Sequence, residues 1–313
     1  MGIRLALIGC GLVLACAVSV VEAEVGGMLP LAASDANGVG LEGLPARPVD
    51  AIDGTTFAAA TDTLDARARQ DVAVREILRG NIPDFERALV PVAVGAVGVD
   101  GRHHNVTFWV TPDYLAIGSE GDFLRMPLDL PAAITVASSL GCLLPTPRMV
   151  DAIYAQSGLR LTPSPLPPGP QMRSNNYILT HRDRVDAQIA TLTRGVQRAS
   201  PTGGKLIAGH KKDVVLTNRY LTQPDRVAIY GWHRPTGQPI QPLSLVHGSR
   251  YFDYSHGVRL VHDQALADGE LRSVYDLLSD PVFAPLLSSE GPMPSARALM
   301  HTAPKADSIA HAS

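Results

Sequence analysis

Residues 1–23 limit how the rest of the chain can be stabilised. One positive charge precedes an uncharged run over residues 5–21 that is rich in Leu, Ile, Val and Ala, a pattern typical of a secretory signal peptide. We expect this segment to be removed and the mature protein to be secreted or periplasmic. Cys10 and Cys16 lie inside it, and Cys142 is the third cysteine of the chain. The mature protein could then form no internal disulfide, so its stability must come from a packed core.

The same segment permits a second interpretation. Residues 12–16 resemble a bacterial lipobox that ends in Cys16, in which case the mature chain would be a lipoprotein anchored at that cysteine. No later segment is long and apolar enough to span a membrane. We therefore expect contact with a membrane only if Cys16 is lipidated.

The net charge of the chain indicates which kinds of partner it can attract. The formal net charge is -3, and 18% of the residues are charged. This balance gives no basic field that would gather nucleic acid. We expect no nucleic-acid partner, and a cell-wall polymer or another extracytoplasmic substrate instead.

Composition divides the mature chain into three parts. Residues 24–63 are rich in Gly, Ala, Asp and Pro without a clear period, which predicts a loosely ordered lead-in. Residues 64–292 are long enough for one globular domain, and residues 293–313 are predicted to be a disordered tail. The Pro-rich segment 163–170 can form neither a helix nor a central strand. It is predicted to be an extended connector and is a candidate internal boundary.

The spacing of apolar residues predicts an α+β fold with a helical N-terminal part and a β-rich C-terminal part. Helices are expected at residues 63–78, 131–140, 146–156, 178–196 and 270–278. Residues 89–99 form a short apolar run, and strands are expected at residues 107–110, 114–117, 205–207, 213–217, 227–230, 243–246 and 258–261. The turn residues at 111–113 indicate that the strands on either side of them form a hairpin.

Polar and titratable side chains are most concentrated at residues 246–260, next to a predicted strand. His247, Asp253, Ser255 and His256 all fall within this stretch. Each of the two histidines is followed by a glycine, which would allow a tight turn or the close approach of a ligand. We therefore expect the functional site here.

The stretch resembles part of a known family, the L,D-transpeptidases of the YkuD type. That family carries a His-Gly pair, then a Ser/Thr-His-Gly-Cys motif and an Arg. The residues that carry the resemblance are His247, Gly248, Ser255, His256, Gly257, Arg259 and Leu260. The family's cysteine is missing, because Val258 follows Gly257 directly. The resemblance implies an enzyme that cross-links or trims bacterial peptidoglycan.

These residues lead us to expect chemistry at an amide bond of a cell-envelope polymer. His256 is the expected general base, with His247 beside it, and Cys142 is the expected nucleophile, provided that an imidazole lowers the pKa of its thiol. The alternative for Cys142 is a small buried residue between two packed helices. The residues expected to bind substrate are Arg259, Arg250, Asp253, Ser255, His210, His233 and Trp232.

Other functions stay open at this point. His247, Asp253 and His256 could supply three ligands to a catalytic zinc ion; otherwise the sequence calls for no cofactor. A serine mechanism through Ser255 or Ser249 would lack the usual Gly-x-Ser-x-Gly motif. A non-catalytic cell-envelope or carbohydrate-binding protein would instead use its aromatic and Arg side chains to bind ligand.

Overall fold

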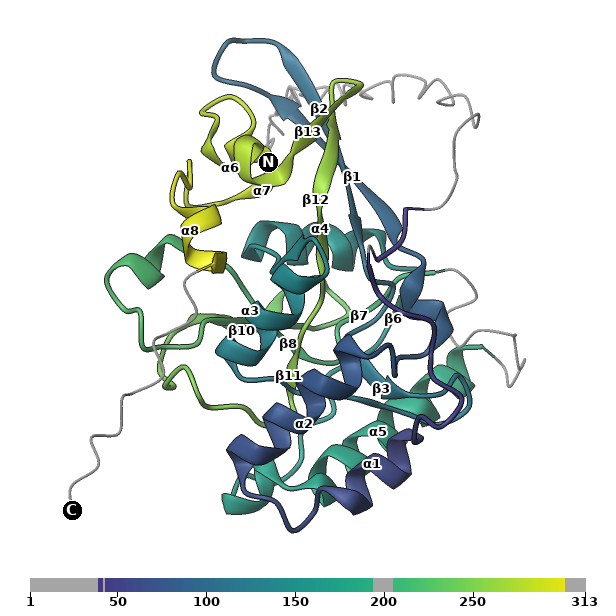
Figure 1. Ribbon diagram of the computed structural model, residues 1–313. Helices are drawn as coiled ribbons and strands as arrows, with labels where there is room; N and C mark the ends of the chain where they lie inside the picture. The colour runs from purple at the N-terminus through teal and green to yellow at the C-terminus, as the bar shows by residue number, and fades with distance from the viewer. Residues whose placement is uncertain (1–38, 42, 194–204, 302–313) are drawn as a thin grey trace, which may run out of the picture. The chain divides into compact units, whose positions relative to one another are not determined.

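The computed structural model describes residues 39–41, 43–193 and 205–301 (Figure 1). These residues belong to one compact unit that begins at Gly38, and they are not divided at the Pro-rich segment 163–170. Both helices and strands are present, so the predicted α+β class is confirmed. The predicted signal peptide lies outside the described residues. Within the described ranges, no helix combines the length and the apolarity needed to cross a membrane.

Helices and strands alternate through the described residues, and the longer helices lie in the N-terminal part, as predicted. The helices are α1 (Gly54–Ala60), α2 (Ala66–Leu78), α3 (Leu130–Ser139), α4 (Pro147–Gln156), α5 (Asn175–Leu192), α6 (Val274–Ser279), α7 (Ala284–Leu287) and α8 (Ala296–His301). The short 3-10 helices are η1 (Asp84–Arg87), η2 (Pro170–Arg173) and η3 (Asn218–Leu221). The strands are β1 (Val90–Val97), β2 (His103–Val110), β3 (Ala116–Gly118), β4 (Phe123–Arg125), β5 (Cys142–Leu143), β6 (Leu159–Arg160), β7 (Ile207–Ala208), β8 (Lys212–Val214), β9 (Ile229–His233), β10 (Pro239–Ser244), β11 (His256–Gly257), β12 (Val261–Ala267) and β13 (Glu270–Ser273).

Two sheets organise the molecule. The larger has the order β1-β2-β12-β13, with β5 also paired to β12, so it joins strands from both halves of the sequence. The smaller has the order β10-β9-β8-β11. In Figure 1, α2 and α3 lie next to each other, and α5 lies near α1. The chain passes from the smaller sheet to the larger one between β11 and β12, which are separated by only a few residues.

The helices with strong end signals begin and end near the predicted residues. Asp129 and Thr146 cap α3 and α4 by accepting hydrogen bonds from the backbone N–H three residues on, and proline occupies the first turn of each helix. Gly141, with φ +63°, follows α3 in the left-handed conformation that suits glycine.

The predicted hairpin of residues 107–110 with 114–117 is wrong. Strand β2 pairs with β1 and β12, whereas β3 pairs with β4. The turn at 111–113 leads out of the large sheet, because the Thr111 N–H is bonded to the Leu260 carbonyl rather than within a hairpin.

Three other boundaries also differ from the predictions. The supposed lead-in contains α1, whose Phe57 is fully buried in the core. The supposed tail contains α8, with Met300 fully buried. The predicted helix at 270–278 begins as strand β13, because Asp268 and Gly269 both have positive φ and form the tight turn of the β12–β13 hairpin. Helix α1 was not predictable from the spacing of apolar residues, because Phe57 is the one large apolar residue in its seven positions.

Candidate functional site

His256 is placed by a very short parallel strand pair. Strand β11 contains only His256 and Gly257, and it pairs with β8 so that His256 lies opposite Lys212. A Cβ atom on Gly257 would lie 2.5 Å from the ring of Tyr114. The glycine after the histidine is therefore required by a buried aromatic ring.

The His256 imidazole is fully buried. No described residue makes a hydrogen bond to either ring nitrogen, although Nε2 lies 3.8 Å from Oδ2 of Asp253. Burial lowers the pKa of His256 more than the charge of Asp253 raises it. The ring is thus neutral near pH 7 and can accept a proton.

Asp253 is held in one orientation by its neighbours. Its Oδ1 accepts hydrogen bonds from the backbone N–H and the Oγ of Ser255, at 2.8 and 2.6 Å. Its Oδ2 accepts one from the hydroxyl of Tyr251 at 3.1 Å. Burial favours a higher pKa for Asp253, but its attraction to a protonated His256 and the bonds from Ser255 outweigh it and lower the pKa overall. The carboxylate is ionised beside a neutral imidazole.

Two partly exposed rings lie against this pair. The rings of His247 and Tyr251 are stacked with centroids 4.0 Å apart, and the His256 ring lies 5.7 Å from Tyr251 and 6.5 Å from His247. The structure therefore brings His247, Asp253, Ser255 and His256 together, as the sequence predicts. We call His247, Tyr251, Asp253, Ser255 and His256 the histidine cluster.

Ser255 cannot serve as a serine nucleophile activated by His256. In such enzymes the histidine lies between the serine and the acid, whereas here the Ser255 hydroxyl donates directly to Asp253. Ser255 therefore orients the carboxylate.

His210 belongs to a second, deeper group of titratable side chains. It is fully buried, and its Nε2 lies 3.3 Å from Oδ1 of Asp113, whose Oδ2 accepts a 2.8 Å hydrogen bond from Nε of Arg125. Burial lowers the pKa of His210 to about 4, against the opposing effect of Asp113. His210 is thus an internal residue, and the prediction that it binds substrate is not supported by its position.

Sequence reasoning missed the partners that complete this deeper group. The hydroxyl of Tyr114 donates to Asp213 at 2.8 Å, and burial raises the pKa of Asp213 to about 6. Nζ of Lys211 donates to the carbonyl of Tyr254 at 2.6 Å, and burial lowers the pKa of Lys211 to about 7. The Lys-Lys-Asp run at 211–213 was the only available signal.

Arg259 does not bind substrate as predicted. Its side chain is fully buried, and its guanidinium donates to the carbonyls of Thr111 and Ile207, at 2.6 Å each. The guanidinium also lies over the ring of Tyr114 at 4.6 Å. Arg259 therefore ties together backbone segments that are distant in sequence.

Arg250 lies on the surface near the histidine cluster in sequence. Its side chain is 45% exposed and its Nη1 lies 3.6 Å from Oδ2 of Asp129, the cap of α3. The guanidinium of Arg250, which was expected to bind substrate, is therefore paired with Asp129.

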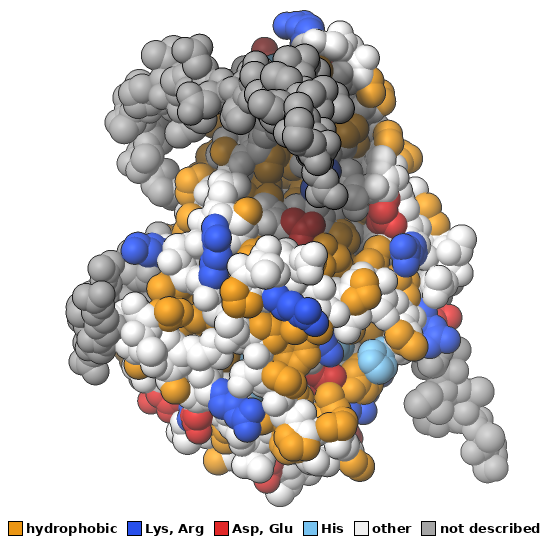
Figure 2. Space-filling model, turned by 180° about the vertical axis from the view of Figure 1, so that it is seen from behind, with side chains coloured by type: hydrophobic (Ala, Val, Ile, Leu, Met, Phe, Trp, Pro, Cys, Tyr) orange, Lys and Arg blue, Asp and Glu red, His pale blue; other side chains and the backbone are white. Residues whose placement is uncertain are grey.

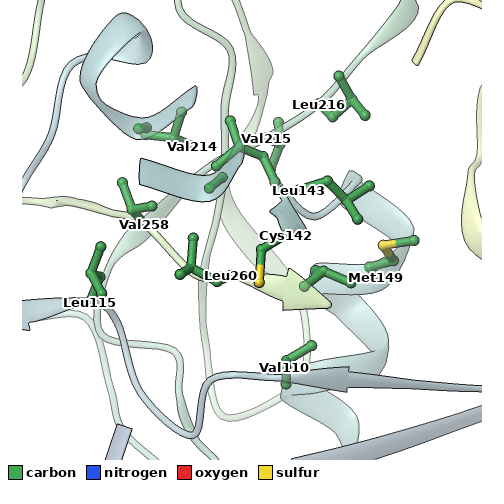
Figure 3. Packing of buried hydrophobic residues seen from close by; sticks show 14 of the residues in the cluster. Val110, Leu115, Cys142, Leu143, Met149, Val214, Val215, Leu216, Val258 and Leu260 are labelled. Carbon is green, nitrogen blue, oxygen red and sulfur yellow. The ribbon is translucent and has the colours of Figure 1, made fainter. Parts of the chain in front are cut away.

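Cys142 is enclosed by the hydrophobic core, so the prediction that it is the nucleophile is wrong. Figure 3 shows its sulfur among Val110, Leu143 and Leu260. The thiol is 2% exposed and donates to the carbonyl of Leu140 at 3.3 Å. Its cross-strand partner is His262 in the large sheet, not a member of the histidine cluster. Cys142 is surrounded by apolar core side chains, whereas the equally buried His256 lies against the partly exposed rings of His247 and Tyr251.

His233 and Trp232 lie side by side on β9 but have different surroundings. Nε2 of His233 lies 2.8 Å from Oδ1 of Asp151, and its ring stacks on Tyr154 with centroids 4.4 Å apart. Trp232 is 8% exposed, and Nζ of Lys212 lies over its ring, 4.9 Å from the ring centroid. Only Trp232 therefore connects to the histidine cluster, through Lys212.

The geometry does not favour zinc. Among residues 39–41, 43–193 and 205–301, no group of three or more His, Cys, Asp or Glu side chains is arranged to hold a metal ion. His247 stacks on Tyr251 instead of converging with Asp253 and His256.

The surface shows no concentrated charge on the side seen in Figure 2. Lys and Arg side chains are scattered there among hydrophobic and uncharged ones.

No protein-family model, curated protein or solved structure matches the chain.

Proposed function

We propose that the protein is an exported hydrolase that cleaves an amide bond of a cell-envelope polymer such as peptidoglycan, with His256 as general base. The observation that carries this proposal is a neutral, fully buried imidazole next to an oriented carboxylate and to the partly exposed rings of His247 and Tyr251, with no hydrogen bond from a described residue to either of its nitrogens. Buried polar atoms of this kind are rare in folded proteins. Perturbed groups in such a pair are typical of acid–base sites.

The mechanism uses water as the nucleophile, because Cys142 lies in the core. Nδ1 of His256 takes a proton from the water while Nε2 faces Asp253, whose charge stabilises the imidazolium. The water oxygen bonds to the carbonyl carbon, and the carbon–nitrogen bond breaks. The imidazolium returns the proton to the leaving nitrogen, giving an acid and an amine. Asp253 stays ionised, and Ser255 and Tyr251 hold it in position.

Support for the substrate class comes from the sequence. The predicted signal peptide would send the chain to the cell envelope, and the motif around His247 and His256 resembles that of enzymes acting on peptidoglycan. Lipidation at Cys16 would retain the same enzyme at the membrane.

Substitution of His256 tests the proposal directly. We expect His256→Asn to lower kcat/KM by about 10²–10⁴-fold, measured as amino groups released from purified peptidoglycan. Because burial lowers the pKa of His256, the acid limb of kcat/KM should lie below the usual range for histidine. A folded His256→Asn enzyme with full activity would contradict the proposal, as would a wild-type protein that releases nothing.

Cys142→Ala is the matched variant, since it removes the other predicted catalytic group. With water as nucleophile, the variant keeps its turnover. A loss of turnover in a folded Cys142→Ala protein would instead restore the thiol mechanism.

A non-catalytic envelope-binding protein is the second candidate, and one observation favours it. His256 exposes none of its surface, whereas His247 and Tyr251 are partly exposed and could contact a ligand. Binding of peptidoglycan without release of amino groups would establish this function in place of hydrolysis.

A further inference from the structure

Two cations beside the histidine cluster form no ion pair with an acidic side chain of the described residues. Lys212 is partly buried, and its Nζ makes no hydrogen bond or ion pair with any described residue; it lies 4.9 Å above the ring of Trp232. The guanidinium of Arg173 lies over the rings of Tyr251 and Phe252, at 5.8 and 4.8 Å. Its Nε is buried without a hydrogen-bond acceptor in the described ranges. Partly buried cations are costly without a compensating charge.

Trp232 adds a third donor without an acceptor. The residue is more than nine-tenths buried, and no described atom accepts a hydrogen bond from its Nε1. Like the two cations, this indole N–H can only donate. A ligand with oxygen acceptors would supply hydrogen-bond partners for Lys212, Arg173 and Trp232.

These donors are connected through the histidine cluster. Lys212 and His256 are register partners on adjacent strands, so their side chains leave the small sheet on the same face. Asp253 affects the pKa values of both Lys212 and His256. Arg173 adjoins the cluster through Tyr251, because the ring beneath its guanidinium belongs to the residue whose hydroxyl donates to Asp253.

The backbone at Trp232 is strained in a way that fixes this arrangement. Its φ is +56°, a conformation that is costly for a bulky side chain. The Trp232 N–H donates to the carbonyl of Lys211 at 3.1 Å, which holds the strained residue next to Lys212. Strain of this kind persists where the surrounding structure enforces a particular placement.

We propose that Lys212, Trp232 and Arg173 bind an oxyanion of the ligand, and that in the hydrolase described above this group is a carboxylate of the substrate. The assignment of a carboxylate rests on the proposed function, whereas the binding of an oxyanion does not. It moves the anion-binding role from Arg259, which is fully buried, to Lys212 and Arg173. Asp253, the one acidic member, is already occupied by Ser255 and Tyr251.

Binding of small probes tests this inference apart from hydrolysis. The probes are an N-acetylated dipeptide with a free carboxylate, its C-terminal amide and inorganic phosphate, titrated by calorimetry against the full chain. We expect the acid to bind and the amide to bind at least about tenfold more weakly, since a charge-assisted hydrogen bond is lost. Tighter binding of phosphate than of the acid would keep the oxyanion site and change its ligand class.

Substitutions identify the residues responsible. Lys212→Met should weaken binding of the preferred anion about tenfold or more, and Arg173→Met should also weaken it. The control is Lys205→Met, at an exposed lysine outside the cluster. The inference is overturned if wild type binds neither anion better than the amide, or if both substitutions at the cluster match the control.

The same titration with His256→Asn separates the two proposals. Retained anion binding in this variant, with no hydrolysis by wild type, would leave the oxyanion site standing and remove the hydrolase. Hydrolysis that depends on His256 but not on Lys212 or Arg173 would leave the hydrolase standing and remove the oxyanion site.

Discussion

At the scale of single residues, the two glycines that follow the histidines differ in the space around them. A Cβ on Gly257 would lie 2.5 Å from the buried Tyr114 ring, whereas a Cβ on Gly248 would meet only the Asp225 carbonyl at 3.9 Å. The Tyr114 ring cannot move away easily, because its hydroxyl is bonded to Asp213.

We therefore expect Gly257→Ala to lower the free energy of unfolding by about 1–3 kcal/mol, the usual cost of overpacking a core. Gly248→Ala is the matched control and should change it by less than about 0.5 kcal/mol. Urea unfolding of both variants measures the difference. Equal stability of the two variants would show that the contact with Tyr114 does not constrain this position.

Distance along the chain decides which site residues could be predicted. His247, Asp253, Ser255 and His256 lie within ten residues of one another, so their sequence spacing was enough to group them. The hydrogen bond from Arg259 to Thr111 spans 148 residues, and only the topology brings these two together. A sequence shows that an arginine follows the motif but not that it is buried.

At the scale of elements, His104 joins strand β2 to the turn of another hairpin. Its Nδ1 lies 2.6 Å from Asp268 in the β12–β13 turn, and its Nε2 lies 3.0 Å from Asp100 in the β1–β2 turn. The hydrogen bonds to Asp268 and Asp100 raise the pKa of His104 above its usual value. The charged form therefore stabilises the contact between the two hairpins.

The sign of this effect gives a prediction for pH. A histidine with a raised pKa stabilises the folded state fully below its unfolded pKa, and the stabilisation is lost as the pH rises through the raised value. We expect His104→Gln to destabilise the protein most near pH 6 and progressively less towards pH 9. Thermal unfolding across this range, with the exposed neighbour variant His103→Gln as control, measures it. A loss of stability in His104→Gln that does not depend on pH would contradict the ion pairs.

Elements with local end signals were predictable, and those defined by pairing were not. The cap at Thr146 and the proline after it place the start of α4 from sequence alone. Strand β11 has two residues and exists only because β8 lies beside it. The residues at Asp268 predict the start of a helix but form the β12–β13 turn, because a short polar turn precedes both kinds of element.

At the scale of the whole molecule, buried charges join parts of the chain that are far apart. Asp113 precedes β3, Arg125 ends β4 and His210 precedes β8, yet all three are buried in one group. Arg125 also donates to Asp186 on α5 at 3.2 Å. The first and second halves of the sequence therefore share one internal network, which explains why the Pro-rich segment is not a domain boundary.

The energetic weight of this network can be measured by removing one partner. Arg125→Met leaves the Asp113 carboxylate buried without its main counter-charge, and the expected loss is about 3–5 kcal/mol of unfolding free energy. Arg219→Met is the control, because Arg219 is 52% exposed and lies 3.8 Å from Glu290; its expected loss is about 0–1 kcal/mol.

A double-mutant cycle then distinguishes the ion pair from simple packing. Adding Asp113→Asn to Arg125→Met removes the uncompensated charge, so the double variant should be less destabilised than the sum of the two single variants by about 0.5–3 kcal/mol. Urea unfolding of the four proteins gives this coupling. Additive effects would mean that Arg125 and Asp113 stabilise the fold independently, and that the halves of the chain are held together by apolar contacts rather than by the buried charges.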